Sequence, residues 1–136
     1  MLINSVMLEI RESDVPIRGN AMVSGDSEYD RKVENEIIER LDSGDIYAWF
    51  DAKVTVEIEV NGVKFEGYDI LGACSYKSLE QFLESGGYYD DMVQTALDNA
   101  LSELRESFHG TLNESEVKAL DLSGIKPVVM VSQADG

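Results

Sequence analysis

The chain has 136 residues, 43% of them apolar, and its 27 acidic and 11 basic residues give a net charge of −16. This length predicts a single domain over residues 1–136, and the charge disfavours direct binding to nucleic acids or anionic membranes. The single cysteine excludes an intrachain disulfide, no apolar run approaches the roughly 18 residues of a membrane span, and no signal-peptide pattern begins the sequence. We therefore expect a cytoplasmic protein.

The first two elements are predicted from hydrophobic periodicity. Residues 2–10 alternate between stronger and weaker apolar positions, which is typical of a strand with one buried face. Residues 27–42 predict a helix, because apolar side chains recur at every fourth position: Tyr29, Val33, Ile37 and Leu41. Asp26 or Ser27 is the expected N-cap, and Gly44 is suited to ending this helix.

A long hairpin is predicted over residues 46–71. Every even position before its turn is apolar, and Asn61-Gly62 is the strongest short-range hairpin signal, a type I′ turn. The alternation weakens beyond Gly67, where we expect a bulge or bend.

The outer face of this hairpin carries charges whose pairing follows from a two-residue turn. Glu59 is then opposite Lys64, which is favourable, whereas Glu57 is opposite Glu66. Like charges directly opposite one another are mildly destabilising. We interpret this conflict as one that a basic partner would relieve.

The remaining elements complete an α+β domain. Ser78 and Gln81 form a capping box for a short helix over 79–84, and a longer amphipathic helix follows over 88–108. Residues 127–131 predict an edge strand inside a C-terminal extension, 111–136, that we expect to be less ordered. The order of elements predicts a mainly antiparallel sheet with the three helices on one face.

A search for catalytic groups gives no motif. His109 is the only histidine and lies in the last turn of the long helix, where a positive charge favours the helix dipole. Cys74 could pair with it as a nucleophile and base, but nothing in the spacing supports a dyad, and a lone cysteine after a strand is typically buried. We expect no enzymatic activity and no catalytic residue.

Metal and cofactor motifs are also missing from the sequence. Residues 26–30 begin like a calcium loop, but Arg31 and Ile37 stand where that loop requires Gly and Glu. A weak divalent-ion site among Asp26, Asp30 and Asp45 is the remaining alternative. No zinc spacing, phosphate loop or dinucleotide fingerprint is present, so we expect neither a metal nor a cofactor.

The acidic residues are concentrated in the second half of the chain. Residues 80–116 hold nine acids and one base, Arg105. Acids at a helix start complement the dipole, but Asp98, Glu103 and Glu106 lie further along and have no such role. Together with Glu57, Glu59 and Glu66 they are our candidates for contact with a basic partner. The alternative is a solvated helix face.

Three aromatic residues are candidate anchors for the same contact. Tyr47 and Trp49 occupy the odd positions of the long predicted strand, opposite its apolar face, and Tyr89 follows a Gly-Gly pair. Aromatic side chains on a face expected to be solvated indicate either a contact surface or a segment that covers them. Trp and Tyr are favoured anchors because they bury much area at little entropic cost.

Several phrases resemble small proteins encoded by phages and prophages, usually left as hypothetical. They are "GNAMVSGDSEYDRKVENEIIERLDSGDIYAWFDAKVTV", "ILGACSY" and "GGYYDDM", within residues 19–105. The resemblance implies an accessory protein that inhibits host defence, such as an anti-CRISPR or anti-restriction protein. It does not extend to the tail after Gly110.

Charge and resemblance together predict a non-enzymatic inhibitor that imitates a phosphate backbone. Its partner would be a host protein or ribonucleoprotein complex with a basic nucleic-acid-binding groove, bound without direct contact to nucleic acid. The alternative is a structural or regulatory phage protein that forms a homodimer through an edge strand or through Tyr47 and Trp49.

Overall fold

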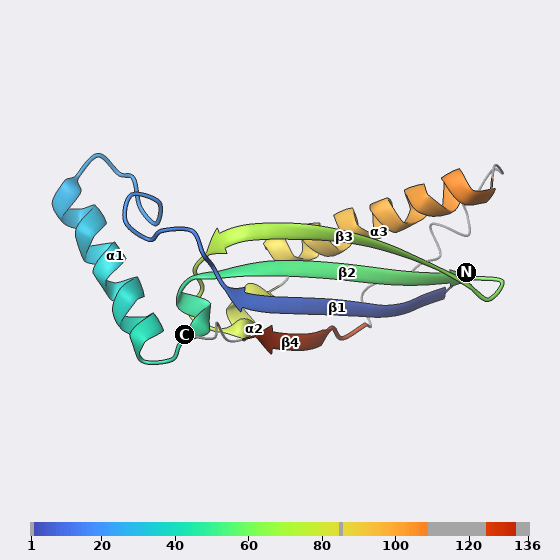
Figure 1. Cartoon of the computed structure of the whole chain (residues 1–136), viewed down its shortest axis with the longest axis horizontal. Coiled ribbons are helices and arrows are strands. Elements are labelled where there is room, and N and C mark those ends of the chain that lie inside the picture. The colour runs from blue at the N-terminus through green and yellow to red at the C-terminus, as the bar shows by residue number, and fades with distance from the viewer. Residues whose placement is uncertain (1, 85, 109–124, 133–136) are drawn as a thin grey trace.

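The structure is a computed structural model, and it describes residues 2–84, 86–108 and 125–132. Four strands form one sheet: β1 (Leu2–Glu12), β2 (Phe50–Val60), β3 (Val63–Cys74) and β4 (Val128–Ser132). The helices are α1 (Ser27–Asp42), a 3-10 turn η1 (Ile46–Ala48), α2 (Leu79–Phe82) and α3 (Tyr88–Phe108). Figure 1 shows the three long strands side by side, with α3 along one face and α1 beyond one end.

The sheet confirms the predicted α+β class. Its strand order is β3-β2-β1-β4, and every neighbouring pair is antiparallel except β1 and β4, which are parallel. β4 is the predicted edge strand shifted by one residue, and it lies within the segment that we expected to be less ordered. The other residues of that segment that are described are 125–127, and residues 111–124 and 133–136 lie outside the described part of the chain.

The predicted hairpin register is confirmed. Asn61 and Gly62 both have positive φ, 51° and 81°, as a type I′ turn requires, and Glu57 pairs with Glu66 across the two strands. The bulge expected beyond Gly67 is present. It lies between Leu71, which pairs with Ala52, and Cys74, which pairs with Phe50. The start of the hairpin was predicted wrongly, since residues 46–48 form η1. Asp45 caps that turn by accepting a hydrogen bond from the Tyr47 N–H, 3.1 Å away.

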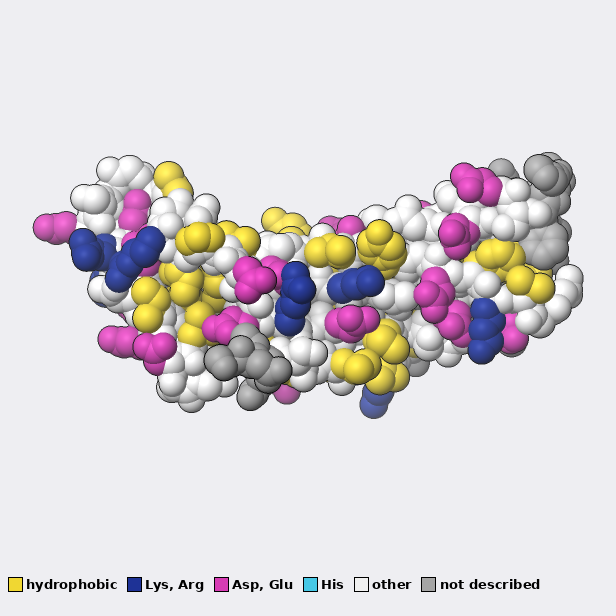
Figure 2. All heavy atoms as spheres, in the orientation of Figure 1, with side chains coloured by type: hydrophobic (Ala, Val, Ile, Leu, Met, Phe, Trp, Pro, Cys, Tyr) yellow, Lys and Arg dark blue, Asp and Glu magenta, His cyan; other side chains and the backbone are white. Residues whose placement is uncertain are grey.

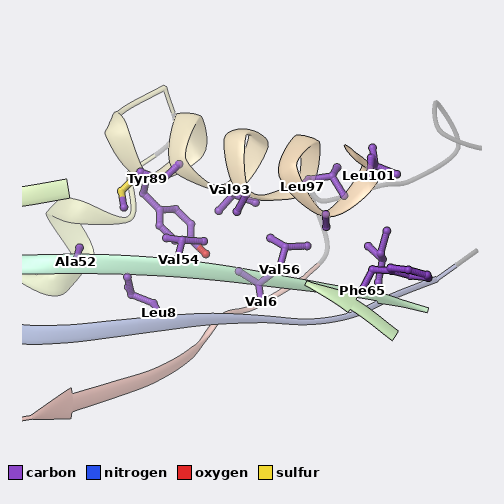
Figure 3. Packing of buried hydrophobic residues seen from close by; sticks show 14 of the residues in the cluster. Val6, Leu8, Ala52, Val54, Val56, Phe65, Tyr89, Val93, Leu97 and Leu101 are labelled. Carbon is purple, nitrogen blue, oxygen red and sulfur yellow. The ribbon is translucent and has the colours of Figure 1, made fainter. Parts of the chain in front are cut away.

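The main core lies between the sheet and α3. Alternate residues of β2 are buried, and the buried side of α3 packs on them; Figure 3 shows Val93 and Leu97 pointing toward Val54 and Val56. Gly67 on β3 makes this approach possible. A Cβ atom at Gly67 would overlap the backbone of α3 at Ala96 and Ala100. The helix can therefore lie this close to the strand only because residue 67 has no side chain.

The predicted position of the first helix was wrong. The helix over residues 27–42 forms with the predicted bounds, and Asp26 caps it by accepting from the Glu28 and Tyr29 N–H groups. It does not share the face of the sheet with α2 and α3, because its buried side packs on η1 instead. Ile37 of α1 joins Ala48 and Trp49 in a second, separate core cluster.

A buried carboxylate ties the preceding loop to α1. Glu34 is 7% exposed and accepts hydrogen bonds from the Gly19 N–H at 2.7 Å and from Arg18 Nη1 at 3.1 Å. The Gly19 N–H, followed by the Arg18 guanidinium, lowers the pKa of the Glu34 carboxyl. These bonds give Glu34 a role in structure, since they hold the loop at residues 18–19 against α1.

We predict that Gly67→Ala lowers the free energy of unfolding by roughly 1–3 kcal/mol, because the new methyl group forces α3 away from β3. Chemical denaturation measures the loss. Gly72→Ala is the matched control on the same strand, since the atom nearest to its added Cβ is Asp51 Oδ1 at 3.9 Å. Equal stability of the two variants would contradict the close contact.

Candidate functional site

The α3 carboxylates predicted to bind a partner lie away from the core. Asp98, Glu103 and Glu106 are all exposed, while the opposite side of the helix is buried. Asp98 accepts a hydrogen bond from Gln94 Nε2 at 3.0 Å. Among the described residues, no ion pair within 4.0 Å involves any of these three carboxylates. Their charge is therefore presented on one side of the helix without a basic partner in the part of the chain that the structure describes.

The hairpin glutamates lie on the other side of the sheet, and one of them is already paired. Glu57 Oε1 is 3.7 Å from Lys64 Nζ and 3.2 Å from Asn4 Nδ2, and its side chain is 22% exposed. Lys64 thus pairs diagonally with Glu57 and not with Glu59 directly opposite. Lys64 thus offsets part of the conflict between Glu57 and Glu66 within the chain, and our interpretation that a basic partner relieves it stays a prediction.

The predicted acidic residues therefore do not share one face, and they extend from the middle of α3 to the hairpin end of the molecule. The hairpin turn and the C-terminal end of α3 lie together at the right of Figure 1, and Figure 2 shows several acidic side chains and one base there. Asn99 Nδ2 donates to the Tyr68 carbonyl oxygen at 3.0 Å, which ties one flank of α3 to the edge of β3. Glu103 lies one turn further along that flank. We call this region the acidic end, and it comprises Glu59, Glu66, Asp98, Glu103 and Glu106.

Two of the three predicted aromatic anchors are core residues, and the third is partly buried against the core. Trp49 is 4% exposed, lies in the cluster under α1, and donates from Nε1 to the Val15 carbonyl oxygen at 2.8 Å. Tyr47 is half-buried in η1, with its ring edge-on to Phe50 at 5.6 Å. Tyr89 is 8% exposed, and burial raises the pKa of its hydroxyl to about 12. Sequence periodicity missed this because it gives no sign that α1 folds back over residue 49.

Trp49 is the only tryptophan, so its fluorescence tests this placement directly. We predict a blue-shifted emission and weak quenching by acrylamide, because the indole is enclosed by the second core cluster. Denaturant should shift the emission to the red and restore quenching. Strong quenching in the native protein would restore Trp49 as a surface anchor.

Cys74 is held in a form that opposes nucleophilic chemistry. Its Sγ donates to the Phe50 carbonyl oxygen at 3.3 Å, and burial raises the thiol pKa to about 12. The thiolate is the reactive form, so little of it exists near neutral pH. His109, its proposed partner, lies outside the described residues.

We predict that iodoacetamide modifies native Cys74 slowly at about pH 8 and that the rate rises with pH toward the pKa of the thiol. The protein unfolded in urea is the control, where the thiol should react at the rate of a free cysteine. Rapid alkylation of the native protein at neutral pH would support an activated nucleophile. Mass spectrometry of quenched samples gives the rate.

The three aspartates of the alternative metal site do not come together. Asp26 caps the start of α1, whereas Asp45 lies beyond its end and pairs with Arg40 at 2.8 Å. Asp30 accepts hydrogen bonds from Ser24, including one of 2.6 Å from its hydroxyl. Across residues 2–84, 86–108 and 125–132, no group of three or more His, Cys, Asp or Glu side chains is placed to hold a metal ion.

One surface was missed by the sequence analysis. The face of the sheet opposite α3, which we call the open sheet face, exposes four side chains with apolar character, Tyr68, Ile70, Val128 and Met130, and Met7 beside them is half-buried. Figure 2 shows apolar side chains on both sides of two central basic ones. A hollow of about 290 Å³ on this face is bordered by Ile70 and by the charged residues Glu9, Arg11, Asp51 and Lys53. The apolar even positions 68 and 70 in β3 were the available signal.

Comparisons of the chain with protein-family models, with curated proteins and with solved structures found no match. The resemblance to phage-encoded proteins therefore stays a prediction. Within the described part of the chain, no helix combines the length and the apolar character that crossing a membrane requires.

Proposed function

We propose that this protein is a non-enzymatic binding protein that uses its acidic end to occupy a basic nucleic-acid-binding groove on another protein. The observation that carries the proposal is the set of exposed α3 carboxylates, for which the structure gives no ion pair among the described residues. The resemblance adds the context of a phage protein that inhibits a host defence complex in the cytoplasm. The partner would then be a protein or ribonucleoprotein of that complex.

The spacing of the charges decides what kind of contact this is. Asp91, Asp98 and Glu106 follow one another along the outer side of α3, about 10–12 Å apart at the rise of an α-helix. Duplex DNA carries one charge per ~1.7 Å of its axis. The carboxylates on α3 are therefore too widely spaced to reproduce the charge pattern of a DNA duplex. They support the narrower mechanism in which a few carboxylates meet the basic residues that would otherwise hold phosphates.

Electrostatics would act mainly on the rate of association. A protein with a net charge of −16 is attracted to a basic groove before the two surfaces touch. The range of this attraction depends on salt, and at 0.1 M salt it is about 10 Å. Mutations of exposed charges typically change association rate and salt dependence more than dissociation. With Trp49 and Tyr89 in the core, the residues that slow dissociation must be others.

We predict that the triple variant Asp98→Lys, Glu103→Lys, Glu106→Lys loses its partner. The tagged wild-type protein is used to capture proteins from host lysate with washes at low and at high salt, and the bound proteins are identified by mass spectrometry. A DNA- or RNA-binding protein should be retained at low salt and shed at high salt. The same protein should lose affinity for its nucleic acid when the wild-type chain is added.

The matched control is Glu28→Lys, Glu36→Lys, Glu39→Lys, three exposed acids of α1 whose reversal changes the net charge equally. This control should keep the partner, because α1 lies at the other end of the molecule. Loss of binding in both variants would show that only net charge matters. Binding that is insensitive to salt and to the α3 reversals would refute the proposal.

A further inference from the structure

On the open sheet face, the neighbouring strands β1 and β2 carry side chains of opposite charge side by side. The strand register aligns Ile70 of β3, Lys53 of β2, Glu9 of β1 and Met130 of β4 in one row across the sheet. One row away, Asp51 of β2 lies beside Arg11 of β1, with Arg11 Nε 3.3 Å from Asp51 Oδ2. These four charges sum to zero in a chain whose net charge is −16.

This arrangement is complementary to itself. A two-fold axis parallel to the strands, placed above the boundary between β2 and β1, exchanges β2 with β1 and β3 with β4. Lys53 of one copy then faces Glu9 of the other, and Ile70 faces Met130, each contact occurring twice. Neither Lys53 nor Glu9 has an ion pair within 4.0 Å among the described residues. Lys53 Nζ instead lies 4.8 Å from the centre of the Tyr68 ring.

We propose that the open sheet face is the interface of a homodimer with this two-fold symmetry. The inference goes beyond the proposed function, which uses the other side of the sheet and the hairpin end. Two copies repel each other over most of their surface, but the charges balance in the two rows that hold Lys53, Glu9, Asp51 and Arg11, where apolar side chains are also exposed. The glutamates on this face, Glu57, Glu59 and Glu66, lie further along the strands toward the hairpin turn. Ile70 is 58% and Met130 52% exposed, and packing two sheets face to face removes both from water.

The size of the face indicates a weak dimer. Four strands about 4.8 Å apart and three rows of outward residues about 6.7 Å apart cover roughly 400 Å² per copy. A standard stable interface buries about 800 Å² per partner. Dissociation constants in the micromolar range or weaker are therefore expected, and the dimer must be sought at high protein concentration.

The test is sedimentation of the full chain up to about 500 μM, with single and combined charge reversals. Wild-type protein should show a monomer–dimer equilibrium that tightens from about 0.1 M to about 0.5 M NaCl, because salt screens the repulsion between two acidic chains. Glu9→Lys alone and Lys53→Glu alone should each weaken the dimer about tenfold or more. Mixing these two variants should give a heterodimer, since each charge of one then faces its opposite on the other.

Controls separate the interface from folding and from net charge. Glu39→Lys and Lys32→Glu, both exposed on α1, make the same charge changes away from the face and should leave the dimer intact. Glu9→Lys also lowers the net repulsion, so a stronger dimer from that variant would contradict the proposal.

Thermal unfolding of each variant shows that it is folded, and Ile70→Glu should abolish the dimer independently. A monomer at every concentration, or a mixture no better than its components, would overturn the proposal and leave the face to a different partner.

Discussion

The close packing of α3 on β3 is the constraint on which the rest of the molecule depends. At Gly67 the helix backbone lies where a side chain would otherwise be, so the helix is held at a short distance along the strand. This contact buries one side of α3 and so fixes the direction in which the side chains of its exposed side point. The exposed carboxylates owe their rigid placement to a residue with no side chain of its own.

A single helical layer leaves the protein with two surfaces of different character. On one side, α3 presents charge that finds no counterion among the described residues. On the other, the sheet faces outward with apolar side chains and with charges of both signs, and there Arg11 pairs with Asp51. Burial alone would raise the pKa of Asp51, but hydrogen bonds from the Ala73 N–H, Ser13 and Arg11 outweigh it and lower that pKa. The Asp51 carboxylate therefore keeps its negative charge near neutral pH.

Short-range sequence signals correctly predicted the features that depend on interactions between residues close together in the chain. Capping residues and periodicity gave the bounds of α1 and α3, and Asn61-Gly62 gave the hairpin register. The errors arose where distant segments meet. Trp49 continues an alternating pattern in the sequence, yet α1 folds over it, and Lys64 chooses a diagonal partner over the residue opposite. Neither the path of a helix beyond a sheet nor the choice among nearby carboxylates is encoded by spacing alone.

The parallel pairing of β1 with β4 has a consequence for how the chain folds. β1 is the first described element and β4 the last, so their pairing closes the longest loop in the sheet and must be among the late events. During synthesis, β1 can pair with β2 long before β4 leaves the ribosome. Until β4 pairs with it, the other edge of β1 presents unpaired backbone N–H and C=O groups, and a wrong strand can pair there. The pairing of β4 closes this edge, so the risk of wrong strand pairing ends only when the last described strand has joined the sheet.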